Sequence, residues 1–265
     1  MTTLFSSDIY KLLRNKAAIF GIIGSIALSV GLSLISYYSY IKRGAADIPF
    51  YGQEGVEILG GVSSVITFWL AVFVAFFVAS EFQYGTVRSE ISLGKPRTWI
   101  YFSKFLCTVI IFASAFLAVS VTMTLINTIL YNFGDMSAVE FISYFAWNYF
   151  MRLLFALPCA AIFCAIAFIG KSPALTIAFG VMYMFVMAAV TQLLLGYINV
   201  EGPLNLALRV SPEYYGTFFG KTDSLAEIGA IGVEHFTRDS IIVCTGYIAA
   251  ACALGCLVFS KKDVK

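Results

Sequence analysis

The stretch Ser80–Lys104, SEFQYGTVRSEISLGKPRTWIYFSK, decides the fold, because it is the most polar segment between two long apolar runs. Glu81 ends the preceding run, and a Gly-Thr pair at residues 85–86 opens two predicted helical turns. Gly94 closes them, since a glycine just past a helix end tolerates the left-handed backbone. Pro96 suits the first turn of the helix that follows. We therefore predict a short helix that two long apolar helices carry outside a membrane.

The composition of the chain indicates a membrane protein. Sixty per cent of the residues are hydrophobic and 12% are charged, and the mean hydropathy is +0.88. A water-soluble chain cannot bury so much apolar surface. The net charge of +2 and the absence of a basic tract argue against nucleic acid as a partner. Six spans and their connections use nearly all 265 residues, so no soluble catalytic domain fits and we do not expect an enzyme.

We predict an all-α polytopic membrane protein with a single transmembrane domain over residues 1–265. It begins with an amphipathic interfacial helix over residues 4–16, whose apolar side holds Phe5, Ile9, Leu12 and Leu13. The predicted transmembrane helices are 17–40, 59–80, 99–131, 144–169, 174–195 and 240–260. Residues 81–98 form the polar loop with its short helix. Residues 196–239 form the longest outer segment, with short helices at 204–210 and 214–219.

Small residues recur every fourth position in the first span, at Gly21, Ser25, Ser29 and Ser33. Such a stripe lets two helices approach closely. Packing within the chain and a seam between two copies both explain it. The six cysteines all fall in apolar runs, so we expect no disulfide framework.

The lysines and arginines predict the orientation. Eleven lie on the side of the N-terminus and of Ser80–Lys104, five lie on the other side, and Arg152 is unassigned. The positive-inside rule then places both termini and Ser80–Lys104 in the cytoplasm.

No motif in the chain predicts a cofactor or metal bound by this chain. Residues 169–172, Ile-Gly-Lys-Ser, lack the first glycine of a phosphate-binding loop, since Ala165 stands there, and their context is a membrane helix. The single histidine, His235, has only Glu234 beside it.

Three polar residues within apolar runs are candidates for a transport pathway: Arg152, Asn127 and Gln192. Arg152 stands near Trp147 and Tyr149, and we expect its side chain to reach outward to the membrane surface. An amide such as Asn127 or Gln192 more often joins two helices by a hydrogen bond.

The short helix has an apolar strip, Val87 and Ile91, among polar residues that include Arg88 and Ser89. Composition alone allows two interpretations. One is a capped, solvated turn between two spans, and the other is a plug for a groove on a soluble subunit.

Residues 81–88, EFQYGTVR, with 92–97, SLGKPR, and Lys104 resemble the signature of ABC-2-type transporter permeases. That family has a glutamate at the end of span two, then Gly-Thr, a coupling helix, a Pro/Ser-Arg turn and a lysine in span three. The span count, the N-terminal helix and the broken outer segment are similar along nearly the whole chain. Gly-Lys-Pro-Arg replaces the Pro-x-Ser-Arg of many members, which leaves the geometry of that turn open.

The resemblance implies one permease subunit of an ATP-driven transporter in a bacterial plasma membrane. Two permeases, identical or related, would pair with two cytoplasmic ATPase subunits that hold ATP and Mg, and this chain would not itself be catalytic. Nucleotide closure would move spans two and three as a lever. The residues that the resemblance assigns to coupling are Glu81, Gly85, Thr86, Val87, Arg88, Ile91 and Arg97.

The apolar spans suit amphipathic peptides, antimicrobials or hydrophobic drugs better than ions or sugars, so we expect export or immunity. A secondary transporter is one alternative, but it would need carboxylates near mid-bilayer and an inverted repeat. A membrane receptor or scaffold is another. A membrane enzyme has the least support, since no nucleophile–base set is visible.

Overall fold

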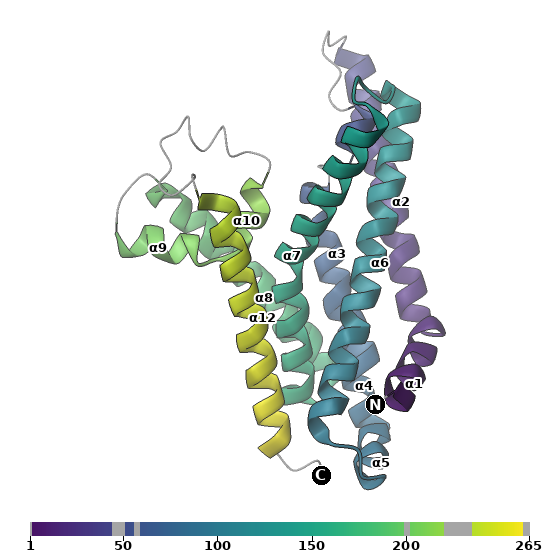
Figure 1. Ribbon diagram of the computed structural model, residues 1–265, viewed down its shortest axis with the longest axis vertical. Coiled ribbons are helices and arrows are strands. Elements are labelled where there is room, and N and C mark those ends of the chain that lie inside the picture. The colour runs from purple at the N-terminus through teal and green to yellow at the C-terminus, as the bar shows by residue number, and fades with distance from the viewer. Residues whose placement is uncertain (1, 44–50, 56–58, 199–201, 220–234, 262–265) are drawn as a thin grey trace.

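Over the residues that the structure describes, the protein is an all-α bundle with six helices long and apolar enough to cross a membrane (Figure 1). The computed structural model describes residues 2–43, 51–55, 59–198, 202–219 and 235–261. The long helices are α2 (Lys16–Arg43), α3 (Leu59–Val74) with its continuation to Gln83, α6 (Arg97–Tyr131), α7 (Ala138–Gly170), α8 (Pro173–Leu194) and α12 (Phe236–Lys261). The predicted all-α, multi-pass membrane fold is thereby confirmed.

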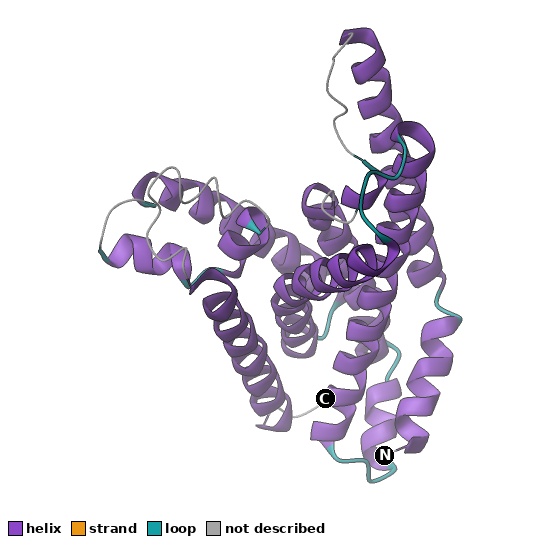
Figure 2. Cartoon of the chain, turned by 45° about the horizontal axis from the view of Figure 1, so that its top comes forward, coloured by secondary structure: helices purple, strands orange, loops and turns teal. Residues whose placement is uncertain are grey.

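The short elements gather at the two ends of the bundle (Figures 1 and 2). Helices α1 (Thr2–Leu13) and α5 (Thr86–Ser92) lie at the end where α12 finishes. The opposite end carries the 3₁₀ turn η1 (Gly52–Glu54), α9 (Pro203–Arg209) and α10 (Pro212–Phe218). Helices α9 and α10 match the two short helices predicted in the outer segment, although residues 199–201 and 220–234 of that segment lie outside the described residues.

One predicted boundary is wrong by nearly two turns. The sequence predicts a turn over residues 132–143, but α7 begins at Ala138. Ser137 and Glu140 form a capping box, in which the Ser137 amide donates to Glu140 Oε2 at 3.0 Å and the Glu140 amide donates to Ser137 Oγ at 3.4 Å. This exchange satisfies two amides that the first turn of a helix otherwise leaves without partners.

The stripe of small residues on α2 packs within the chain. Ser25, Ser29 and Ser33 are buried, and Ser33 Oγ lies 3.2 Å from Met123 Sδ of α6. Gly21 has no room for a side chain, because the Trp69 ring of α3 occupies the position that a Cβ would take. Of the two interpretations of the stripe, the structure shows close packing between α2 and its neighbours α3 and α6.

An aromatic triad joins three spans near the α5 end. The ring centroids of Phe82 and Phe168 lie 5.4 Å apart, those of Phe168 and Phe259 4.8 Å, and those of Phe82 and Phe259 6.0 Å. These edge-to-face contacts each contribute about 1 kcal/mol beyond the burial of the rings. The second, fourth and sixth spans therefore form one packed unit at this end.

The second span contains a π-helical turn, η2 (Ala75–Ala79), which leads into α4 (Ser80–Gln83). A π turn holds one more residue than an α-helical turn, so it rotates everything that follows by about 100°. The turn places Glu81 at the start of α4 on the side that faces α6.

Candidate functional site

Two glycines in the left-handed conformation bracket α5. Gly85 precedes the helix with φ of 73°, and Gly94 follows it with φ of 78°. The Thr86 hydroxyl donates to the Glu81 carbonyl at 3.0 Å, which fixes the turn between α4 and α5. Pro96, with extended backbone, then starts α6 at Arg97. The predicted short helix with its glycine ends is present, and α5 projects at the end of the bundle (Figure 1).

A buried ion cluster lies directly above α5, and Lys104 of α6 is at its centre. The Lys104 ammonium is 2.6 Å from Asp8 Oδ1 of α1 and 2.8 Å from Glu81 Oε2 of α4. Ser103 Oγ donates to the second oxygen of Asp8 at 2.6 Å. Lys104 is 1% exposed and Asp8 is fully buried. Three elements distant in sequence therefore meet at one ammonium.

Lys11 of α1 is the second cation of this cluster and brings in α5. Its ammonium lies 3.2 Å from Glu81 Oε1, 3.5 Å from Glu90 Oε1 of α5 and 3.7 Å from Asp8 Oδ1. Partial burial by itself lowers the pKa of Lys11, but the carboxylates of Glu81, Glu90 and Asp8 outweigh it and raise the pKa above its usual value. Lys11 is therefore charged at neutral pH and links α5 to α1.

The cluster, defined as Asp8, Lys11, Glu81, Glu90 and Lys104, contains three carboxylates and two ammonium groups. Glu90 Oε2 is buried and accepts no hydrogen bond within the described part of the chain. Removing one member of a buried ion pair costs about 3–5 kcal/mol, because the partner charge stays buried. The cluster thus holds α1, α4, α5 and α6 in one arrangement.

Of the five residues of this cluster, only Glu81 was among the predicted site residues. Asp8 was detectable from helical spacing, because it lies three residues after Phe5 and four before Leu12, on the inward face of α1. Lys104 was noted as part of the resemblance, and a lysine within an apolar span requires a buried partner. No local pattern marked Lys11 or Glu90, whose roles depend on how the helices meet.

The expected apolar strip of α5 does not face outward. Val87 is 1% exposed and belongs to the main core, and Ile91 packs against that core. The surface of α5 and its flanks is formed by exposed residues of mixed character: Tyr84, Arg88, Ser89, Ser92 and Leu93. Val87 and Ile91 therefore attach α5 to the bundle and are not available to a partner.

Helix α1 departs from the prediction at its end and at one residue of its inward face. It ends at Leu13, and Lys16, the predicted last residue, already begins α2. Phe5 and Ile9 pack against the core and Leu12 is buried, so these three residues share one face as predicted, but that face turns to the bundle and not only to the membrane surface. Leu13 is 72% exposed and points away with Tyr10, which is 59% exposed. The inward face follows the spacing 5, 8, 9, 12, so Asp8 takes the place on it that was assigned to Leu13.

Arg97 connects the start of α6 to the end of α12. Its Nη1 donates to the Ser260 carbonyl at 3.0 Å and to the Phe259 carbonyl at 3.4 Å. These carbonyls belong to the last turn of a helix, where no amide is available within the helix. Arg97 thus joins the third and sixth spans.

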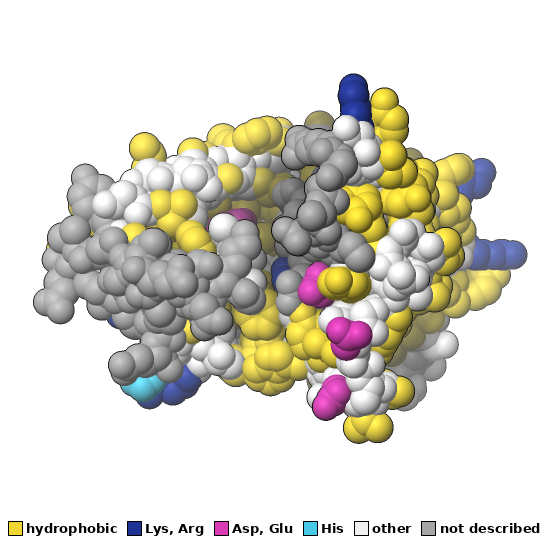
Figure 3. Space-filling view, turned by 90° about the horizontal axis from the view of Figure 1, so that it is seen from above, with side chains coloured by type: hydrophobic (Ala, Val, Ile, Leu, Met, Phe, Trp, Pro, Cys, Tyr) yellow, Lys and Arg dark blue, Asp and Glu magenta, His cyan; other side chains and the backbone are white. Residues whose placement is uncertain are grey.

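The surface charge at the α5 end is basic. Among the described residues, the exposed charged side chains there are Arg14, Lys16, Arg88 and Lys261, whereas the acidic ones, Asp8, Glu81 and Glu90, are buried in the cluster. The opposite end, seen in Figure 3, exposes acidic as well as basic side chains, Asp135 and Glu140 among them.

The three pathway candidates do not share a site. Arg152 is 8% exposed, and its guanidinium carbon lies 5.5 Å from the ring centroid of Phe219, just past α10, so it does not reach the surface as expected. Asn127 is buried one turn from Met123 and Tyr131, whose side chains contact α2. Gln192 is exposed on α8. These three residues therefore do not line one transport pathway in the described part of the chain.

A protein-family model described as "Protein of unknown function (DUF2705)" matches residues 22–265, nearly the whole chain. A search of curated proteins found no match. The matched description names no activity, so a function has to be argued from the geometry of the α5 end.

Proposed function

We propose that this chain, which belongs to the DUF2705 family, is the permease subunit of an ATP-binding cassette transporter. Two permeases, identical or related, assemble with two ATPase subunits that bind ATP and Mg, and this chain itself is not catalytic. The resemblance of residues 81–104 to ABC-2-type permeases motivates the proposal. The observation that carries it is the buried ion cluster, which ties the projecting helix α5 to the spans on either side of it.

The cluster gives α5 the properties of a transmission element. Lys11 bridges Glu90 of α5 and Glu81 of α4, and Lys104 ties α4 to α6. If α5 moved alone, the ion pairs between these side chains would break, and each charge would stay buried without its counterion. Motion of α5 therefore moves the second and third spans. The sixth span follows, because Arg97 of the third span is hydrogen-bonded to the Ser260 carbonyl.

The docking surface in this proposal is the exposed side of the α5 region. Tyr84 is 81% exposed and Leu93 is 76% exposed, and Arg88 lies between them in sequence. Tyrosine and arginine are enriched where proteins bind one another. The ATPase is expected to offer an apolar groove with an acidic edge, since the exposed charges at this end are basic.

The same charges favour an orientation with the α5 end and both termini in the cytoplasm of a bacterial cell, by the positive-inside rule. The cargo class follows from the apolar spans. We propose export of an amphipathic or hydrophobic compound, such as a peptide, an antimicrobial or a drug.

The test is to purify the chain from cell membranes together with the ATPase subunit that the proposal requires, and to replace Arg88→Glu and Leu93→Asp together. Both side chains are exposed, so the bundle should fold normally. We expect the affinity for the ATPase to fall at least about tenfold, as for two central interface residues, and ATP-dependent export to fall with it. Val139→Asp, exposed at the opposite end, is the matched control and should behave as wild type.

Two results would contradict the proposal. One is a double variant that binds the ATPase and exports cargo at the wild-type rate. The other is cargo movement by the purified chain in vesicles that contain no ATPase.

A further inference from the structure

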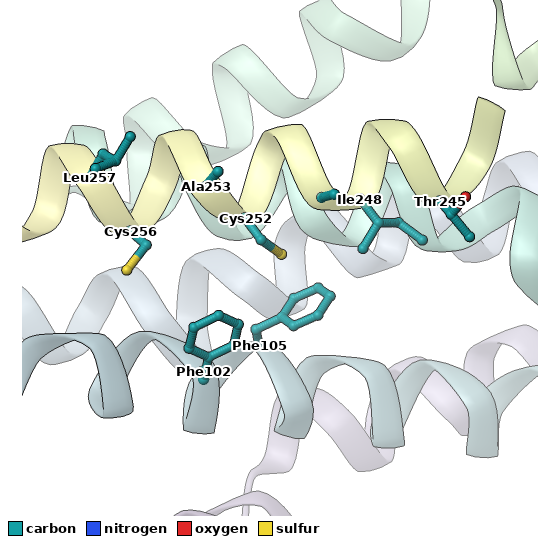
Figure 4. A pocket seen from close by; sticks show the side chains of 9 residues that line it. Phe102, Phe105, Thr245, Ile248, Cys252, Ala253, Cys256 and Leu257 are labelled. Carbon is teal, nitrogen blue, oxygen red and sulfur yellow. The ribbon is translucent and has the colours of Figure 1, made fainter. Parts of the chain in front are cut away.

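An apolar groove of about 660 Å³ runs between α6 and α12 (Figure 4). Phe102 and Phe105 of α6 form one wall, and Ala249, Cys252, Ala253 and Cys256 line the side of α12. In Figure 4 the two rings lie between the helices, with Cys252 and Cys256 directed toward α6. These four α12 residues recur at helical spacing and are small, so the middle of α12 leaves space open beside the rings, between the larger Ile248 and Leu257.

The groove offers nothing to a polar ligand. Thr245 is its only residue with a hydroxyl, and that hydroxyl donates to the Ile241 carbonyl of its own helix at 2.6 Å. The occupant must therefore be apolar over the length of the groove.

The groove has the dimensions of one membrane leaflet. From Thr245 to Leu257 it extends twelve residues along α12, or about 18 Å at the rise of an α-helix. Half of a typical hydrocarbon core is about 15 Å. Phe102 is 42% exposed and Leu257 is 54% exposed, so the groove opens sideways, toward the bilayer that surrounds both spans.

Two cations stand at one end of the groove. Lys261, exposed at the end of α12, lies one turn beyond Leu257. Arg97, at the start of α6, precedes Phe102 by five residues, or about 7.5 Å along the helix. Its bond to Ser260 holds it beside the last turn of α12. The other end, near Thr245, has no charged side chain among the residues that line it.

We infer that this groove is a binding site for one phospholipid with an anionic headgroup. An acyl chain lies along Phe102, Phe105 and the small residues of α12, and the headgroup phosphate faces Arg97 and Lys261. Basic groups at the end of a cleft between membrane helices are the usual setting for anionic lipid headgroups. A second copy of the chain is a poorer occupant, because in the same membrane it would bring its own Arg97 and Lys261 to the same depth.

The experiment is native mass spectrometry of the purified full-length chain in mild detergent, titrated with phosphatidylglycerol or with phosphatidylcholine of the same acyl chains. We expect one phosphatidylglycerol to be retained per chain, about fivefold or more above phosphatidylcholine. Ala253→Phe fills the groove and should lower retention about tenfold. Ala250→Phe, exposed on α12 but outside the groove, is the matched control and should retain lipid as wild type does.

Lys261→Gln provides a second variant whose folding is not in question, since the side chain is exposed. It should reduce the preference for phosphatidylglycerol about fivefold and leave phosphatidylcholine unaffected. Equal retention of the two lipids by the wild type would overturn the inference, as would undiminished retention by Ala253→Phe. A loss of dimer without loss of lipid in Ala253→Phe would assign the groove to a second copy and also overturn it.

Discussion

Lys104 lies two turns into an apolar span, where a lone ammonium group would cost about 3 kcal/mol on insertion scales. In this fold it is 1% exposed yet contacts Asp8 and both oxygens of Glu81 at 2.6–2.9 Å. The ring of Phe77, 5.1 Å from the ammonium, covers a further side. The residue is tolerated because its counterions come from two other elements.

Replacing Lys104→Met should therefore destabilise the protein by about 3–5 kcal/mol, since Asp8 and Glu81 would stay buried without their cation. A thermal melt in detergent, followed by tryptophan fluorescence, measures the change. Lys16→Met, at an exposed lysine, should melt with the wild type.

The double variant Asp8→Asn, Lys104→Met separates charge from packing. It removes one charge of each sign, so it should recover part of the stability lost in Lys104→Met. A Lys104→Met protein that melts at the wild-type temperature would show that the contacts to Asp8 and Glu81 contribute nothing to the fold.

Helical spacing predicts which side chains of α1 and α5 share a face, but not which partners they meet. Helical spacing is sufficient to place Phe5, Ile9 and Leu12 on one face of α1, and the same spacing places Asp8 on that face. Spacing correctly put Val87 and Ile91 on one face of α5, but the interpretation of that face as a plug for a partner was wrong, because the strip packs on the bundle. Which cation would meet which carboxylate depends on tertiary contacts that no local pattern contains.

At the scale of elements, the hairpin between α4 and α6 depends on backbone conformations open mainly to glycine. Gly85 has φ of 73°, and a Cβ added to it would meet nothing within 4 Å, so the cost of a substitution is conformational and not steric. A residue with a Cβ pays about 1–2 kcal/mol in this conformation.

We expect Gly85→Ala to lower the free energy of unfolding by about 1 kcal/mol, and Gly85→Asn to lower it less, because asparagine tolerates the left-handed region. Denaturant titration of the purified chain measures both. Gly31→Ala in α2 is the control, since its Cβ also meets nothing within 4 Å and its φ is ordinary; it should be neutral or stabilising.

If Gly85→Ala and Gly31→Ala unfold at the same denaturant concentration, the left-handed conformation at Gly85 is not required by the native state. The direction of α5 relative to the bundle would then not depend on the backbone conformation of Gly85.

Most helices could be predicted because length and apolar content determine a span. The 35-residue α6, about 52 Å long, exceeds the hydrocarbon core of a bilayer. The early start of α7 had a signal in the sequence, since Ser137-x-x-Glu140 matches the capping-box pattern. The π turn carries no sequence pattern of its own.

At the scale of the whole molecule, the net charge of +2 hides an uneven distribution. The α5 end buries its acidic side chains and exposes its basic ones, whereas the opposite end exposes charges of both signs.

The arrangement of the six spans could not be predicted from the sequence, since all six are similarly apolar. The structure places α3 and α7 at the centre and leaves α2, α8 and α12 mostly exposed.

The uneven charge predicts the orientation of the bundle, and single cysteines test it. All six native cysteines lie in the spans and five are buried, so background labelling should be low. Ser89→Cys should react with a membrane-impermeant maleimide only after the cytoplasmic side is opened. Val139→Cys, exposed at the opposite end, should react in intact cells.

The reverse pattern, with Ser89→Cys labelled in intact cells and Val139→Cys protected, would place α5 outside. No cytoplasmic ATPase could then reach it. The wild-type protein, with only its native cysteines, gives the background labelling to subtract from both variants.

The π turn at Ala75–Ala79 makes the residue count of the second span a functional constraint. Because that turn carries one surplus residue, deleting Phe76, which is 52% exposed and absent from the core, would let the helix close into ordinary α geometry. The carboxylate of Glu81 would then swing about a quarter-turn away from Lys104. Deleting Phe76 should therefore disrupt the ion cluster, whereas replacing its side chain should leave the cluster in place.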